Sequence, residues 1–339
     1  MTTTNNKRDV KNKRDQGPAG IPLDHDIGDP NINLRSEIPE VAQGDSPELS
    51  SRRLSRRRII FRRFLRNKTA VVGLVGIVLL AAFAIVGPYL SPWTYTQVDQ
   101  TAFLQAPSDA HILGTTQAGR DVFALTAEGL RKSMMIGLGV AALQTFIAAC
   151  IGSFAAYYGR WFDKVALWII DLLLVVPAFF IIAIISVQTG DSRGSVLMLI
   201  LLLAGLGWML SARVVRSMTL GIKGLEYVTA AKYMSVSTPR IVFRHIIPNI
   251  SSLLIIDATL ALAAAVLAET SLSFFGFGVQ APETSLGTLI AEGQRMASTY
   301  PWIFLAPATA LTLMLVFINF VGDGLRDALD PSSKSGGRA

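Results

Sequence analysis

The stretch "EYVTAAKYMSVSTPRIVFRHIIPN", from Glu226 to Asn249, separates two long apolar runs. Its first nine residues have the composition of a short helix. Thr238 followed by Pro239 predicts the start of a second helix, with the threonine as N-cap and the proline at the first position. Pro248 then marks the entry to the next apolar run. Links between neighbouring helices usually take about two to eight residues, so this longer elbow favours docking to a partner; an ordinary solvated connector is the alternative.

The composition is that of a membrane protein. The 339 residues are 51% hydrophobic and only 16% charged, and the charges are concentrated in a few places. The net charge of +7 would raise the question of nucleic acid in a soluble protein, but the basic residues flank apolar runs, so we expect no nucleic-acid partner. The single cysteine, Cys150, can make no intrachain disulfide, and the lack of Cys/His clusters predicts no metal site. No bound cofactor is expected.

Six apolar stretches are long enough to cross a bilayer as helices, which takes roughly 20 residues each. Five are uncharged, and a sixth carries Asp257 and Glu269. The predicted fold class is therefore an all-α, polytopic membrane helical bundle with six transmembrane helices. The predicted spans are 69–98, 133–159, 172–190, 194–212, 250–273 and 296–322.

Lysine and arginine residues set the direction of these spans. One side would carry the N-terminal segment, the 160–164 loop, the 213–244 region and the C-terminal tail, with 20 Lys and Arg near the membrane against five on the other side. We therefore predict that both termini and the elbow are cytoplasmic.

The two ends of the chain differ from the six-span domain, 69–325, that they flank. Residues 1–50 are polar and lack hydrophobic periodicity, which predicts a disordered cytoplasmic segment. Residues 51–68 mix nine Lys and Arg with apolar residues. Such a mixture suits a basic amphipathic helix on anionic membrane lipid, and a plain positive-inside flank is the alternative. Residues 326–339 are predicted to form a cytoplasmic tail.

The elbow resembles the loop by which permease subunits of ABC importers engage their ATPases. That motif is Glu-Ala-Ala, three residues, Gly, and about a dozen more residues to a Pro. Ala230, Ala231 and Pro248 match it, whereas Thr229 replaces the glutamate and Ser235 the glycine. Further segments are similar to the second permease of dipeptide, oligopeptide and nickel importers: "HILGTTQAGRDVF" (111–123), "ARVVRSM" (212–218), "ETSLSFFGFGVQAP" (269–282) and "GDGLRDALDP" (322–331).

The resemblance implies a type I ABC importer permease that forms one half of a translocation pathway in the bacterial plasma (inner) membrane. The implied partners are a homologous permease subunit in a heterodimer, two ABC ATPase subunits or domains, and an extracytoplasmic binding protein that delivers di- or oligopeptides. The implied coupling loop spans 216–249. Its ATPase-coupling residues would be Glu226, Thr229, Ala230, Ala231, Ser235 and Pro248.

Two acidic residues of the fifth span are candidates for the substrate pathway. Charged side chains are costly in lipid, so Asp257 and Glu269 are expected to face the bundle interior, a partner subunit or water. One hypothesis is that Asp257 lines the pathway and receives a cationic group, such as a peptide amino terminus. A structural hydrogen bond to a neighbouring helix is the alternative.

The sequence offers no chemistry that could drive transport. It contains no G-x-x-x-x-G-K-[ST] pattern, so ATP is expected to be bound by partner subunits, and no catalytic residues are predicted. Nickel chelates and glutathione-like solutes are alternative cargoes within the family. A passive channel or scaffold, which would not depend on an ATPase, is an alternative from another class. A membrane enzyme would need polar residues gathered at one depth, which the sequence does not provide.

Overall fold

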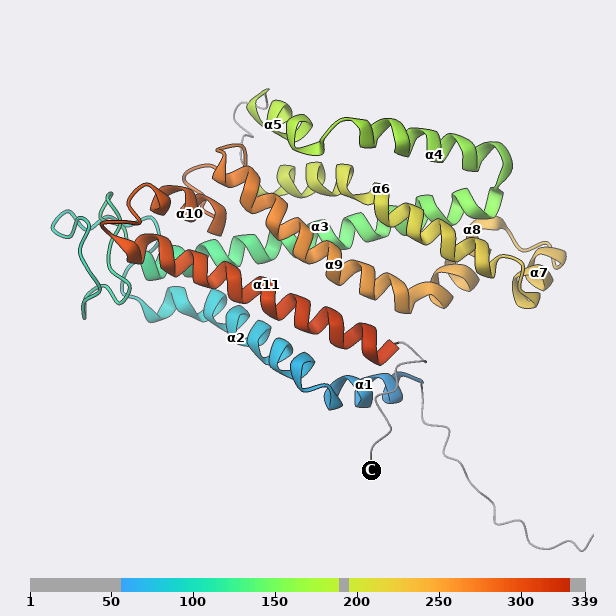
Figure 1. The fold of residues 1–339 in the computed structure, drawn as a ribbon, viewed down its shortest axis with the longest axis horizontal. Helices are drawn as coiled ribbons and strands as arrows, with labels where there is room; N and C mark the ends of the chain where they lie inside the picture. The colour runs from blue at the N-terminus through green and yellow to red at the C-terminus, as the bar shows by residue number, and fades with distance from the viewer. Residues whose placement is uncertain (1–55, 189–194, 330–339) are drawn as a thin grey trace, which may run out of the picture. The chain divides into compact units, whose positions relative to one another are not determined.

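The computed structural model describes residues 56–188 and 195–329, and this part of the chain is built from helices (Figure 1). Its extended pairings are two isolated bridges, Val98 with Arg120 and Thr115 with Asp121. The expected disordered segment 1–50 and residues 330–339 of the expected tail lie outside the described residues. The helices are α1 (Arg56–Arg66), α2 (Lys68–Leu90), α3 (Val122–Tyr158), α4 (Arg160–Val175), α5 (Ala178–Gln188), α6 (Val196–Ile222), α7 (Glu226–Tyr233), α8 (Thr238–Ile241), the π-helix η2 (Val242–Ile246), α9 (Ile247–Phe274), α10 (Leu286–Gln294) and α11 (Pro301–Leu329).

Five helical runs are long and apolar enough to cross a membrane, and α4 and α5 taken together would make a sixth. The predicted all-α membrane bundle is therefore confirmed, but several limits differ. Helix α2 ends at Leu90 rather than at 98, because Ser91 leaves the helical conformation (φ −93°, ψ 141°) before Pro92. Helix α11 begins at Pro301 and continues to Leu329, so the expected start of the tail at Arg326 is helical.

The third predicted span is not one straight helix. Helix α4 ends at Val175, α5 begins at Ala178, and the two are bent by 74° at the break. Pro177 accounts for the break, because its ring removes a backbone donor and disfavours a helical conformation at the residue before it. Val176 is accordingly extended (φ −91°, ψ 122°).

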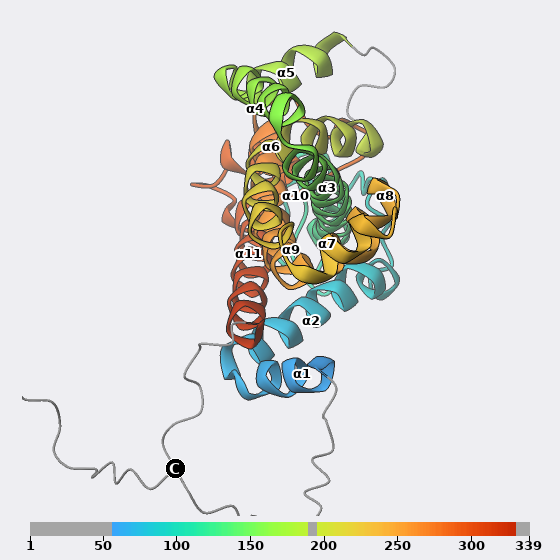
Figure 2. The same ribbon diagram turned by 90° about the vertical axis from the view of Figure 1, so that its right-hand side faces the viewer.

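Two ion pairs hold α4 against α6, beside which it lies (Figures 1 and 2). Arg213 bonds to Asp171, and Arg216 bonds to both oxygens of Asp163, with Nε–Oδ1 at 2.5 Å and Nη2–Oδ2 at 2.6 Å. The bidentate geometry makes the second pair the stronger kind of charged hydrogen bond. The arginines of the 212–218 segment therefore fasten α4, the first half of the broken span, to α6.

Helix α3 begins at Val122, well before the predicted start at 133, and it includes charged residues. The Glu128 carboxylate lies 3.4 Å from Arg131 Nε and 3.7 Å from Lys132 Nζ, and Lys132 also contacts Glu283. Opposite charges three and four residues apart lie on one helix face and partly neutralise each other. The helix therefore continues where a search for uncharged stretches stops.

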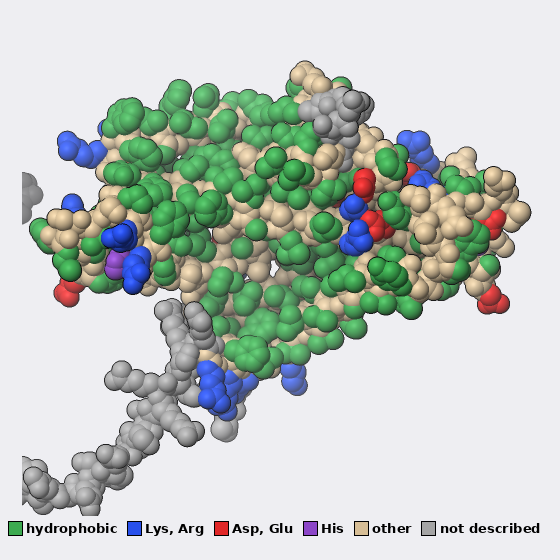
Figure 3. Space-filling view, turned by 180° about the vertical axis from the view of Figure 1, so that it is seen from behind, with side chains coloured by type: hydrophobic (Ala, Val, Ile, Leu, Met, Phe, Trp, Pro, Cys, Tyr) green, Lys and Arg blue, Asp and Glu red, His purple; other side chains and the backbone are tan. Residues whose placement is uncertain are grey.

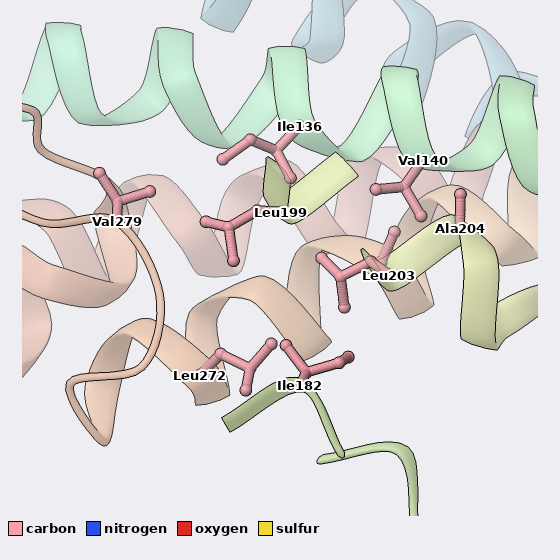
Figure 4. Packing of buried hydrophobic residues seen from close by; sticks show 9 residues of the cluster. Ile136, Val140, Ile182, Leu199, Leu203, Ala204, Leu272 and Val279 are labelled. Atoms are coloured by element: carbon pink, nitrogen blue, oxygen red, sulfur yellow. The ribbon is translucent and has the colours of Figure 1, made fainter. Parts of the chain in front are cut away.

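The core lies where α3, α6 and α9 pack together, while α2 and α11 pack on each other beside it. Helix α10, which was not predicted, packs against α9 and α11 and starts with a capping box formed by Ser285 and Thr288. Figure 4 shows core side chains from α3, α5, α6 and α9 that meet: Ile136, Val140, Ile182, Leu199, Leu203 and Leu272.

The described helices have two ends with different content (Figure 1). Helices α1, α7 and α8 gather at one end, and α5, α10 and the 91–121 loop at the other. The amphipathic helix expected within 51–68 is present as α1, and its Phe64, 7% exposed, packs on Ala70 and Ala328. Seen from behind, hydrophobic side chains cover most of the surface and charged ones gather in a few groups (Figure 3). Such a surface suits lipid or partner subunits on its flanks.

Candidate functional site: the elbow and the inner cavity

The predicted elbow, residues 226–249, lies at the end of the bundle that faces the viewer in Figure 2. Helices α7 and α8 confirm the predicted pair of short helices. The start of the second differs by one residue: Ser237 is the N-cap, and Thr238 and Pro239 are the first two helical residues. Helix α8 then continues through η2 and α9 as one helical run from Thr238 to Phe274.

Helix α7 ends in a Schellman motif. The Val236 N–H donates to the Ala231 carbonyl at 3.1 Å, and the Ser235 N–H donates to the Lys232 carbonyl at 3.0 Å. Ser235 adopts φ +57°, the left-handed conformation that the motif requires. Glycine reaches this conformation freely, whereas another residue is strained by about 1 kcal/mol. The glycine usual at this place in the related motif therefore has a conformational cause, and Ser235 keeps the turn with some strain.

The two alanines of the elbow differ in burial. Ala230 is exposed, but Ala231 is only 6% exposed. Ala231, one of the predicted coupling residues, therefore faces inward, and its small side chain lets α7 lie against its own chain. The elbow cluster, as we call it, consists of Val228, Ala231, Ile241, Val242 and Ile246, packed against Phe154, Tyr157, Ile222, Val236 and Ile247. Because Phe154 and Tyr157 belong to α3, Ile222 to α6 and Ile247 to α9, the elbow cluster joins α7 to three spans.

The tip of α7 exposes two large apolar side chains that were not predicted as functional. Tyr233 is 85% exposed and Met234 is 78% exposed. Large apolar side chains held in solvent mark a contact surface when they lie together. A sequence signal for them exists: Val228 and Ala231, three residues apart, already supply the buried face of this short helix, so neighbouring large residues must point elsewhere.

The other predicted residues of α7 lie on its exposed side. Glu226 is the exposed first residue, and Thr229 is partly buried one turn later. Since residues three apart share a helix face, Glu226 puts an acidic group on the face where the related motif has its glutamate. The Asn249 amide donates to the Tyr227 hydroxyl, which ties α7 to the start of α9.

Pro248 lies within a continuous helical run, directly after a wide turn. The Ile247 N–H donates to the Val242 carbonyl, an i to i−5 bond that closes the π-helix η2. In a regular α-helix the ring of Pro248 would clash with the carbonyl of residue 244, which would also lose its donor. A π turn relieves such a clash by widening the helix locally. The expected entry to the fifth span is therefore a local widening rather than a helix start.

The two predicted pathway residues lie in different surroundings. Asp257 lines a cavity of about 540 Å³ between α3, α5, α6 and α9. Glu269 does not line it and is 0% exposed. The Glu269 carboxylate accepts hydrogen bonds from the hydroxyls of Ser133 at 3.0 Å and Ser273 at 2.7 Å, and the Ser133 oxygen accepts from the Leu286 N–H at 3.2 Å. These bonds join α3, α9 and α10, so the place of Glu269 is structural.

A buried histidine holds the loop before α3. His111 is 1% exposed, with Nδ1 2.9 Å from the Asp121 carboxylate and Nε2 3.4 Å from that of Asp99. Its ring stacks on Trp93 with centroids 4.8 Å apart. Hydrogen bonds from the Thr101 hydroxyl and backbone N–H lower the pKa of Asp99, and His111 lowers it further. The 111–123 segment therefore completes its own hydrogen bonding within this chain.

Within the described residues, no group of three or more His, Cys, Asp or Glu is placed to hold a metal ion.

Comparison with known proteins bears on the elbow and on the first span. Residues 148–335, which include the elbow, match the family described as binding-protein-dependent transport system inner membrane component. Residues 55–107 match the N-terminal TM domain of oligopeptide transport permease C.

Individual relatives align with most of the chain. The chain is 51% identical over 281 residues to the oligopeptide transport system permease protein OppC of Mycobacterium tuberculosis, covering 83% of this chain and 96% of that protein. It is 35% identical over 288 residues to the protein of the same name from Bacillus subtilis, covering 85% and 93%. For the protein of that name from Haemophilus influenzae, the identity is 34% over 275 residues, covering 80% and 88%.

Proposed function

Because the chain belongs to the family of binding-protein-dependent transport system inner membrane components, we propose that it is a permease subunit of an ATP-driven peptide importer. Its relatives are named as permeases of oligopeptide transport systems. The chain is thus a multi-pass membrane component, and peptide uptake is the function that these names and its own features support best.

The observation that carries the proposal is the two-sided elbow. Its outer side offers Tyr233 and Met234 to a partner, and its inner side is the elbow cluster, which contacts α3, α6 and α9. A partner that grips the tip would therefore move three spans together. In this proposal Ala230 admits the ATPase closely, Glu226 and Thr229 face it, and Ser235 shapes the turn beside it. Pro248, with η2, connects the elbow to the fifth span, α9.

The partners follow from the same proposal. Two ABC ATPase subunits or domains bind and hydrolyse ATP, since this sequence contains no phosphate-binding loop of its own. A homologous permease completes the pathway as a heterodimer, and an extracytoplasmic binding protein delivers the peptide. Both termini and the elbow face the cytoplasm of a bacterium, in keeping with the concentration of Lys and Arg on that side. The basic helix α1 rests on anionic lipid there.

Other cargoes and other classes of protein make different predictions. A permease for nickel chelates or glutathione-like solutes would keep the ATPase but would not import peptides. A passive channel or scaffold would neither bind an ATPase nor respond to changes at the elbow tip. Uptake of a labelled tripeptide by proteoliposomes that hold the complete importer, with and without ATP inside, separates these alternatives.

The elbow is tested by a matched pair of double variants. Tyr233→Ala with Met234→Ala removes the exposed tip, and Tyr89→Ala with Leu90→Ala removes an adjacent tyrosine–aliphatic pair that is 86% and 65% exposed at the end of α2. We expect the first to lower co-purification of the ATPase subunits about tenfold or more, since apolar anchors dominate such contacts. The second should leave it unchanged. Equal retention of the ATPases by both variants would overturn the proposal.

A further inference from the structure

The cavity that Asp257 lines is large, mainly apolar and lined by residues of four helices. Its volume of about 540 Å³ lies in the range of small-molecule sites, roughly 300 to 1,000 Å³. Figure 4 shows Val140, Ile182, Leu203 and Leu272, which line part of its wall. The polar side chains that line it are Gln144, Ser211, Asp257 and Ser271, and no Lys, Arg or His is among the lining residues.

Asp257 is the unexplained group in this cavity. It lies ten residues after the start of α9, roughly 15 Å along the helix, and so well inside the span. Its Oδ2 is buried and has no hydrogen-bond partner within the described residues. The alternative of a structural hydrogen bond to a neighbouring helix therefore has no support at that oxygen. An unpaired carboxylate within a membrane span costs free energy. A cation from outside the chain would lower this cost.

Gln144 is held where it can act together with Asp257. A side-chain carbon at Gly207 would lie 2.4 Å from Gln144 Oε1, so the glycine leaves room for the amide to lie against α6. Both residues line the cavity, and so does Ser211 one helical turn further along α6. The wall thus offers one acceptor for a positive charge and two neutral groups that both donate and accept hydrogen bonds.

We propose that this cavity is a subsite for the terminal ammonium group of a peptide. The Asp257 carboxylate pairs with the ammonium, Gln144 and Ser211 hydrogen-bond the adjoining peptide group, and the apolar wall takes the first side chain. A bare divalent cation fits less well, because Ca²⁺ takes six to eight oxygen ligands and Mg²⁺ an octahedral set. The peptide part of this inference rests on the proposed function; the preference for a cation on an apolar body rests on the cavity alone.

The cation preference is tested without any peptide. In the complete importer, Cys150→Ala removes the single cysteine and Ser211→Cys places a thiol in the cavity wall. The probes are aminoethyl and sulfonatoethyl methanethiosulfonate, which are similar in size and opposite in charge. We expect the cationic reagent to react faster by about tenfold, and we expect Asp257→Asn to bring the ratio close to that of a free thiol. The matched control Asp323→Asn changes an exposed aspartate of α11 and should leave the ratio as it is.

Two outcomes would overturn the cation site. Equal rates for the two reagents with Asp257 present would mean that a positive group of the partner permease already neutralises it. Lack of reaction with either reagent would mean that the cavity is closed to solutes.

The peptide assignment is tested on the same preparation. Trialanine should slow labelling of the Ser211→Cys thiol, and this protection should disappear in Asp257→Asn. Uptake of trialanine should fall about tenfold in Asp257→Asn, fall less in Asp257→Glu and stay unchanged in Asp323→Asn. A charge preference without protection by trialanine would keep the cation site but reject the peptide. An importer that carries no trialanine even with Asp257 intact would instead reject the proposed function.

Discussion

The elbow and the opposite end of the bundle, with α5, α10 and the 91–121 loop, differ in how they bury polar side chains; in the proposed topology that opposite end is the outer end. At the outer end, His111 and Glu269 are 1% and 0% exposed, and each meets hydrogen-bond partners of the same chain. In the elbow, the buried side chains are all apolar, and the tip leaves Tyr233 and Met234 in solvent. His111 and Glu269 thus have their partners within the chain, whereas the elbow tip presents two large apolar side chains to its surroundings, as the proposed docking requires. The comparison therefore separates residues that hold the fold from residues that we propose contact a partner.

The largest effect on stability is expected at the two alanines of the elbow, of which only Ala231 is buried. Ala231→Glu places an unpaired carboxylate in the elbow cluster and should lower the free energy of opening of α7 by about 3 kcal/mol. Ala230→Glu adds the same group on the exposed face and should change it by less than about 0.5 kcal/mol. Hydrogen exchange of the amides of 226–236 in the detergent-solubilised complex measures both. Equal loss of protection in the two variants would refute the assignment of inner and outer faces.

The second effect concerns the buried polar network of the outer end. Glu269→Ala removes the acceptor of two serine hydroxyls and should destabilise the complex by about 2 kcal/mol. Glu292→Ala is the matched control, since Glu292 is 55% exposed and its oxygen lies 3.7 Å from Arg120; such a surface pair contributes about 0 to 1 kcal/mol. Thermal unfolding in detergent should separate the two. Similar unfolding temperatures would show that Glu269 is not structural.

A smaller, pH-dependent effect is expected in the loop before α3. The pKa of Asp99 is lowered in the folded protein by its hydrogen bonds with Thr101, so its contribution to loop stability is full above the unfolded value of about 3.9. That contribution is lost as the pH falls through the lower, folded pKa. The protection of the amides of residues 94–104, measured against the intrinsic exchange rate at each pH, should therefore fall below about pH 4. Asp99→Asn should abolish this dependence. An Asp99→Asn variant that keeps the same acid response would contradict the attribution.

The smallest effect is expected at the turn after α7. Ser235→Gly relieves the strain of φ +57°, which stabilises the turn by about 1 kcal/mol. The glycine also raises the conformational entropy of the unfolded chain, which costs about 0.5 to 1 kcal/mol of stability. Exchange protection of α7 should therefore change by less than about 1 kcal/mol, and ATPase co-purification should stay the same. Ser235→Val, a β-branched residue in the same left-handed conformation, should weaken α7 by more. Equal behaviour of the two variants would remove the strain argument.

The sequence predicted the parts of the fold that depend on local patterns. The apolar runs predicted the spans, and Thr238 with Pro239 predicted the second elbow helix to within one residue. Glu226 also marked the start of α7 correctly. These features depend on composition, capping and proline geometry, which act over a few residues.

Features that depend on distant contacts were not predictable. Pro177 is visible in the sequence, but the 74° bend and the pairing of α4 with α6 through Arg213 and Arg216 appear only in the packed fold. The face of Ala231 depends on where α3 and α6 pass. The start of α3 was missed because it carries charges at 128, 131 and 132, and one partner of Lys132 is the distant Glu283. The cavity forms only where four helices pack together, so the sequence alone could not show that Asp257 lines it and Glu269 does not.

The central claim is that the elbow is a cytoplasmic lever completed by an external motor, and one labelling measurement tests it most directly. Met234→Cys in the Cys150→Ala background is treated with a membrane-impermeant maleimide in inside-out and right-side-out vesicles, with and without the ATPase subunits. The account predicts labelling in inside-out vesicles only, and about tenfold protection when the ATPases are present. Labelling from the outer face, or equal labelling with and without the ATPases, would contradict it.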